Sequence, residues 1–227
     1  MFTREMIIEM LNIQEQLEIS ISGENWREDR HDYMLAIHME CSEIVDHFGW
    51  KWWKDTDSQA DWDQITLELI DIWHFALAHN LTHLSDGSKD YIDGLADDVL
   101  EQMYTCIDLI NESKEDYNFL DVVVSTGYHC ITTKQFPLAN FIILCNEINL
   151  GPNDVYALYI SKNALNKFRQ DNGYKDGTYK KSWKFGDVEL EDNQVLMEVL
   201  KEFVMEEREK VTAELITRRL EELYALA

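Results

Sequence analysis

The sequence predicts an all-α protein, and three observations support this prediction. The chain of 227 residues contains only 2 Pro and 9 Gly. Leu, Glu, Ile and Lys, which favour helices, are frequent in it. Apolar residues recur with helical spacing along most of the chain, and no segment alternates as a half-buried strand does. With 45% hydrophobic residues the chain can bury a sizeable core, so a single domain over residues 1–227 is expected.

The first helix is predicted over about residues 3–19. Ile7, Leu11 and Leu17 recur on one of its faces with the spacing of an amphipathic helix. A polar connection with a glycine follows over about 20–30, where this periodicity stops.

The second and third helices are predicted over 33–48 and 61–80. Gly49 is a typical residue for ending a helix, and Asp61 is a good N-cap for the next one. The third helix is apolar nearly all round, which indicates that it is buried.

Six further segments complete the predicted order of elements. Amphipathic helices are expected over 89–112, 115–131, 137–149, 153–171, 192–208 and 210–225. The fourth of these starts after Gly151-Pro152, a typical start signal. Periodicity fails over 171–191, which predicts a long, mobile polar loop; loops of this length are usually functional or disordered.

The charge of the chain excludes one large class of partners. Acidic side chains number 44 and basic ones 20, for a net charge of −24. Such a chain is repelled by nucleic-acid phosphates, so no nucleic-acid partner is expected. Acids interrupt the early apolar runs and no run of 18 apolar residues occurs, which predicts a cytoplasmic protein without membrane contact.

Two pairs of acids have a spacing that suits a metal site. Glu40 and Glu43 lie three residues apart on the second helix, and Glu68 and Asp71 do so on the third. Residues at this spacing share a helix face, so each helix can present two carboxylates to one point. In so acidic a chain such pairs also arise by chance, and the acids could simply be solvated or paired with Arg or Lys.

The neighbours of the second pair favour the metal site. Glu68 has Ile65 and Ile72 one turn away, and Asp71 lies in the same apolar helix. Buried carboxylates repel one another unless a cation is present. Ligation by oxygen atoms alone suits Mg²⁺, with Mn²⁺ as a possible substitute.

A cationic segment opposes the overall charge. It contains the five basic residues Arg169, Lys175, Lys180, Lys181 and Lys184, interspersed with Gly and Tyr. Lysines and backbone N–H groups in a glycine-containing loop can bind phosphates, although lysines can also merely solvate a loop.

Other motifs leave alternatives open. Trp50, Trp52 and Trp53 could stack on a nucleobase or could pack helices. The spacing of Asp71 and His74 is also that of half a di-iron site, whose second half is missing. His79 and His83 are four residues apart but have no further partner of the kind that zinc needs.

Several longer motifs, in order, resemble the all-α dimeric dUTPases, which are relatives of the MazG-type nucleotide pyrophosphatases. The motifs are residues 11–17, 39–46 with 50–54, 68–75, 162–170, 173–177 through Trp183, and 191–193. The resemblance implies a helical bundle of the all-α NTP pyrophosphatase type, elaborated with additional helices. The helices 3–19, 33–48, 61–80 and 153–171 would form its metal-site core, and the loop 171–191 would contact the substrate.

The resemblance also implies an activity, which is the Mg²⁺-dependent hydrolysis of dUTP, and of dUDP, to dUMP by a homodimer. The metal ligands would be Glu40, Glu43, Glu68 and Asp71, and Glu43 would also activate the attacking water. The residues matching phosphate contacts are Arg169, Lys175 and Lys181. Those matching other polar substrate contacts are Asn166, Tyr174 and Asn193, and those matching the uracil and deoxyribose pocket are Gln14 and Trp53.

Two positions depart from the pattern of the family. Glu18 stands where Asn is expected near the nucleoside, and the segment 184–190 is longer than the turn expected there. A related pyrophosphatase with another base preference is therefore an alternative. A non-catalytic acidic helical protein is a second one, but it requires acids spread over an exposed face.

Overall fold

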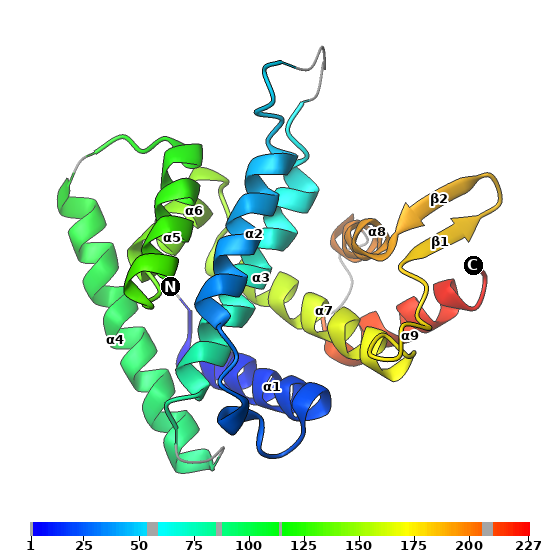
Figure 1. The fold of residues 1–227 in the computed structure, drawn as a ribbon, viewed down its shortest axis with the longest axis horizontal. Coiled ribbons are helices and arrows are strands. Elements are labelled where there is room, and N and C mark those ends of the chain that lie inside the picture. The colour runs from blue at the N-terminus through cyan, green and yellow to red at the C-terminus, as the bar shows by residue number, and fades with distance from the viewer. Residues whose placement is uncertain (1, 54–58, 85–87, 114, 206–210) are drawn as a thin grey trace.

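The computed structural model describes residues 2–53, 59–84, 88–113, 115–205 and 211–227. Within these ranges the chain is all-α, as the sequence predicts, apart from one small two-stranded sheet (Figure 1). None of the helices described there is long and apolar enough to cross a membrane.

Two helices lie side by side at the centre of the molecule, α2 (Tyr33–His47) and α3 (Trp62–Leu81) (Figure 1). Asp32 and Asp61 cap their N-termini, because each side chain accepts a hydrogen bond from a backbone N–H three residues on. The predicted cap at Asp61 is thereby confirmed. Most of α3 is buried, so any polar group on this helix lies close to the core.

Helices α1 (Arg4–Ser22) and α7 (Pro152–Asp171) pack against α3 and against each other. Pro152 occupies the first turn of α7, where its missing N–H costs nothing. The predicted polar connection after α1 contains a short 3₁₀ helix, Trp26–Asp29, that the sequence analysis did not predict. Trp26 is buried there and anchors the connection on the core.

Three helices form a group on one side of α2, and of these α5 packs on α2 (Figure 1): α4 (Lys89–Ser113), α5 (Phe119–Thr133) and α6 (Leu138–Glu147). Helix α5 contacts α2 at Gly127, where a Cβ would lie 2.9 Å from Nδ1 of His38. The close approach of the two helices therefore requires glycine at this position.

The segment 171–191 differs from the prediction. Its second half is an antiparallel hairpin of β1 (Ser182–Phe185) and β2 (Val188–Glu191) rather than a loop. Gly186, with φ of +63°, forms the two-residue turn with Asp187, a combination that favours tight hairpins. The strands are too short for their alternation to stand out in a sequence.

The chain closes with α8 (Asp192–Met205) and α9 (Ala213–Tyr224); the ends predicted at 208 and 210 lie outside the described residues. Helix α9 packs on α7, and Tyr224 contacts the rings of Phe168 and Trp183. This aromatic cluster attaches the hairpin to α7.

Candidate active site

Three of the four predicted metal ligands meet between α2 and α3. Carboxylate oxygens of Glu40, Glu68 and Asp71 all lie within 4.8 Å of one another, the one group of three potential ligands found among the described residues. Glu68 is 4% exposed, and the other two are half-buried. Helical spacing places Glu68 and Asp71 one turn apart, and the packing of α2 on α3 brings Glu40 to them.

The environment of these acids disfavours their ionised forms. Burial, and then the neighbouring charges of Asp71, Glu68 and Glu43, raise the pKa of Glu40 well above its usual range. Burial also raises the pKa of Glu68, although the ammonium of Lys162 opposes this shift. Without a further cation the group therefore retains protons at neutral pH.

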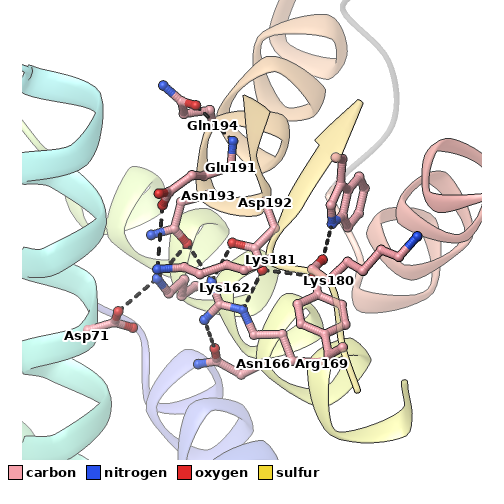
Figure 2. Close-up of polar contacts among 12 residues, drawn as sticks. Asp71, Lys162, Asn166, Arg169, Lys180, Lys181, Glu191, Asp192, Asn193 and Gln194 are labelled. Atoms are coloured by element: carbon pink, nitrogen blue, oxygen red, sulfur yellow. Dashed lines mark hydrogen bonds and ion pairs between the residues drawn. The ribbon is translucent and has the colours of Figure 1, made fainter. Parts of the chain in front are cut away.

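One internal cation is already in place. Lys162, on α7, is 1% exposed, and its Nζ lies 2.8 Å from Oδ2 of Asp71 and donates to Oδ1 of Asn193 at 3.0 Å (Figure 2). When all three carboxylates are ionised, the group including Lys162 has a formal charge of −2. This charge and the oxygen donors fit one hard divalent cation such as Mg²⁺.

Glu43, the fourth predicted ligand, lies outside this group of three. Its side chain is exposed, although the family resemblance places it among the four metal ligands. Its charge nevertheless raises the pKa of both Glu40 and Glu68, so it lies within electrostatic range of them. The arrangement therefore consists of three inner carboxylates and one that faces solvent.

A chain of polar contacts continues from Lys162 along α7 to α8 (Figure 2). Arg169 donates to both carboxylate oxygens of Asp192 at 2.8 Å, and Asp192 is completely buried. The same guanidinium donates to Oδ1 of Asn166 at 3.1 Å and to Oδ1 of Asn193 at 3.0 Å. Arg169, Asn166 and Asn193, all predicted substrate contacts, are thus brought together and held rigidly.

Three other predicted substrate contacts lie on the surface beside these residues. Tyr174 is 48% exposed, and its ring centre lies 5.9 Å from the guanidinium carbon of Arg169. Lys175 donates to the backbone oxygen of Ile21, and Lys181 lies 3.5 Å from a carboxylate oxygen of Glu191. Both lysines are exposed, so they are accessible to an anion.

Gln14 belongs to a buried polar network. Its Oε1 accepts from the Tyr159 hydroxyl at 2.9 Å and lies 2.8 Å from Nδ1 of His74, while its Nε2 donates to Glu18 at 2.8 Å. Glu18 also accepts from Tyr33, and burial raises the pKa of its carboxyl. Gln14 is only 2% exposed, so a nucleobase reaches it only if neighbouring side chains move.

The positions of the tryptophans and of His74 do not support two alternatives that the sequence left open, helix packing by the tryptophans and a di-iron site. Trp53 is 55% exposed and contacts Trp50 and Trp52 edge-on, which describes a surface cluster rather than core packing. His74 is buried against Tyr159, and burial lowers its pKa to about 4. It lies outside the group of three carboxylates, so the described residues give no support to a di-iron site.

Two residues of the site were missed by reasoning from the sequence. Lys162 interrupts the buried stripe of α7 between Leu158 and Leu165, a polar residue at a core position, and this was the available signal. Asp192 occurs in a quoted motif, but its pairing with Arg169 spans 23 positions, and helical spacing cannot predict such a contact.

Comparison with known protein families gives a match. The sequence model of a protein family described as dUTPase matches residues 6–174, which is 169 of the 227 residues. No curated protein matches the chain. The matched range includes α1, α2, α3 and α7, the helices that carry the carboxylates and Lys162.

Proposed function

The chain belongs to the dUTPase family and is a dUTP diphosphatase, and from this premise we propose that it uses Mg²⁺ held by Glu40, Glu68 and Asp71. The observation that carries the proposal is the convergence of three carboxylates beside a buried ammonium, with the pKa values of Glu40 and Glu68 raised. Such a group is stabilised when a divalent cation replaces its protons.

The reaction consumes one water and releases dUMP and diphosphate from dUTP. Mg²⁺, when bound, neutralises charge on the phosphates and acidifies a bound water. The chain supplies positions for the reacting groups, as is typical of phosphoryl chemistry. Lys162 holds Asp71 in place and balances one of the carboxylate charges.

Glu43 is proposed as the residue that orients the attacking water and takes its proton. It is exposed to solvent, one turn from Glu40, and its charge acts on the inner carboxylates. Replacing it by Gln is expected to lower kcat about 10²–10⁴-fold, the usual contribution of a general base, with a smaller effect on Mg²⁺ affinity.

The substrate phosphates are proposed to lie along the row of polar contacts that runs from Lys162 to Arg169. Arg169 would contribute the rigid donor, and the exposed Lys175 and Lys181 the mobile ones. The remaining polar contacts to the substrate would come from Asn166, Tyr174 and Asn193. The ion pair with Asp192 holds the guanidinium of Arg169 in place. This supports its role as the rigid donor, since a donor that is already oriented loses little entropy on binding.

The nucleoside is proposed to lie between Gln14 and Trp53. Tyr159 and His74 flank Oε1 of Gln14, and Glu18 accepts from Nε2, so the amide is orientated. A dNTP panel tests the base preference: uracil selectivity that Gln14→Ala lowers supports the proposal, and selectivity that this change leaves intact contradicts it.

The central experiment measures dUMP release from dUTP for Glu68→Gln and Glu40→Gln. Replacing a residue that only hydrogen-bonds to a metal ligand costs about 10–100-fold, so loss of a direct ligand is expected to lower kcat/KM at least ~100-fold. Glu101→Gln is the matched control, an exposed acid on α4, and should retain full activity. Unchanged turnover in Glu68→Gln would contradict the metal assignment. The same assay with dUDP, which would release dUMP and phosphate, tests the second substrate.

A homodimer is also proposed. Four large apolar side chains are exposed on the adjoining helices α2 and α5: Leu35, Met39, Val124 and Tyr128. Exposed apolar groups on neighbouring elements are typical of protein interfaces. Sedimentation should show a dimer that Tyr128→Lys weakens, and a wild-type monomer at all concentrations would contradict the proposal.

A further inference from the structure

A pair of histidines that the carboxylate site does not use lies at the C-terminal end of α3. His79 lies in the last turn of the helix and His83 follows four residues later, just beyond the C-cap residue Thr82. Their rings are 4.9 Å apart and nearly perpendicular, and Nε2 of one lies 3.4 Å from Nε2 of the other. His79 is half-buried and His83 is exposed.

The spacing of the two nitrogens suits a metal chelate. With Zn–N distances of about 2.0–2.1 Å and tetrahedral angles, two ligating nitrogens lie about 3.3–3.4 Å apart. The observed 3.4 Å agrees with this value, whereas hydrogen bonds donated by N–H are typically ~2.9–3.0 Å long. The distance between the two nitrogens therefore matches that of two ligands on one metal ion better than that of a good hydrogen bond.

The electrostatic surroundings favour a cation at this position. The pair lies at the C-terminal end of α3, where the helix dipole places partial negative charge. Burial, and then the charge of His83, lower the pKa of His79, while Asp32 opposes this shift. A lowered pKa leaves the ring of His79 neutral, with a lone pair available for a metal.

The ligand type separates this pair from the carboxylate group. Imidazole nitrogen suits Zn²⁺ and other borderline cations, whereas Mg²⁺ prefers oxygen. The carboxylate of Asp32, which caps α2 and pairs with Lys134, is close enough to act electrostatically on His79. His79 also borders a cavity of about 330 Å³ that Gln102 and Gln135 line, so water has access to complete the coordination.

We propose that His79 and His83 form a second, distinct metal site that binds Zn²⁺ or a similar borderline cation at the C-terminal end of α3. Two protein ligands leave about two positions of a tetrahedral ion for water or another donor. The site is therefore open and exchangeable, and its occupancy stabilises the end of the helix that carries the carboxylates.

The test is a calorimetric titration of the full chain with ZnCl₂ in the presence of excess Mg²⁺. Wild-type protein should show a binding event that His83→Gln and His79→Gln both remove. His129→Gln, on α5, is the matched control and should bind as wild type does. The event should persist in Glu68→Gln, which separates it from zinc bound by the carboxylates.

Thermal melting adds a readout that does not depend on heat of binding. His83 is exposed, so His83→Gln should melt at the wild-type temperature without zinc and should lose the increase that zinc gives to wild type. Zinc binding of equal strength in wild type and in both histidine variants would overturn the proposal. So would the absence of any binding by wild type up to millimolar zinc.

Discussion

At the scale of single residues, the same polar side chain has a different role according to what surrounds it. Glu40 and Glu43 lie one helical turn apart, yet Glu40 faces Glu68 and Asp71 while Glu43 faces water. Burial raises the pKa of Glu40, because the ionised form loses solvation that nothing nearby fully replaces.

The raised pKa of Glu40 predicts an unusual dependence of stability on pH. Above the ordinary carboxyl pKa the folded protein binds more protons than the unfolded chain. The contribution of Glu40 to the stability of the metal-free protein is therefore fullest at acid pH and declines as the pH rises toward the raised pKa. Gln needs no proton in order to be buried uncharged, so Glu40→Gln should raise the free energy of unfolding near pH 8 by ~1 kcal/mol or more.

Urea unfolding in EDTA at about pH 5 and pH 8 measures this effect. The gain from Glu40→Gln should shrink at the lower pH, because the unfolded wild-type chain is then also partly protonated at this carboxyl. Glu101→Gln, at an exposed position on α4, should show little change at either pH. A stability difference that is the same at both pH values would argue against a raised pKa.

At the scale of elements, a few long-range pairs decide where helices lie. Asp192 is at the start of α8, and Arg169 is near the end of α7, so their buried ion pair joins the two helices. The Trp183 indole donates to the backbone oxygen of Lys180 and packs on Phe168, which places the hairpin against α7. These contacts position the side of the site where the substrate phosphates are proposed to bind.

Asp192→Asn is therefore predicted to be strongly destabilising. Removing one partner of a buried ion pair leaves the other charge uncompensated, which costs about 3–5 kcal/mol. The matched control is Asp171→Asn, which breaks the exposed pair of Asp171 with Lys167 on the same helix. Exposed pairs contribute about 0–1 kcal/mol, so equal losses of stability in the two variants would contradict the role assigned to Asp192.

At the scale of the whole molecule, the net charge of −24 is divided between surface and interior. Most acids are on the surface, but a few face one another between α2 and α3, with Lys162 as the internal counter-ion. An acidic enzyme that binds a polyphosphate requires cations between the two, and the −2 left on the carboxylate group fits one Mg²⁺.

Because the carboxylate group retains protons when no metal is bound, Mg²⁺ binding is predicted to release them. The cation replaces protons on Glu40 and Glu68, whose pKa values burial raises. Calorimetry near pH 7 in two buffers of different ionisation enthalpy should give different apparent enthalpies of binding. Glu40→Gln should reduce that difference, and identical enthalpies in both buffers for wild type would contradict the prediction.

Much of the fold could be predicted because helical periodicity is a local property. The predicted helices over 33–48 and 61–80 agree within a residue or so with α2 and α3. The single domain over 1–227 and the mobility of the segment 171–191 stay predictions. The hairpin was missed because strands of four residues give too few positions for alternation to show.

The carboxylate site could be predicted in part, and for an equally physical reason. Spacing within a helix indicates that Glu68 and Asp71 share a face, but whether Glu40 or Glu43 joins them depends on how α2 is rotated against α3. That rotation is set by packing, including the contact at Gly127 with α5. No spacing rule contains this information.

The sequence by itself determined the helical class, the acidic character, the dUTPase resemblance and the residues from which a metal site could be built. These properties follow from composition, periodicity and short motifs, which are all local. Only the tertiary structure decided that Glu40 faces inward and Glu43 outward, that Lys162 balances Asp71, and that Asp192 holds Arg169. Each of these depends on distances between helices, and folding alone brings such distant residues within reach of one another.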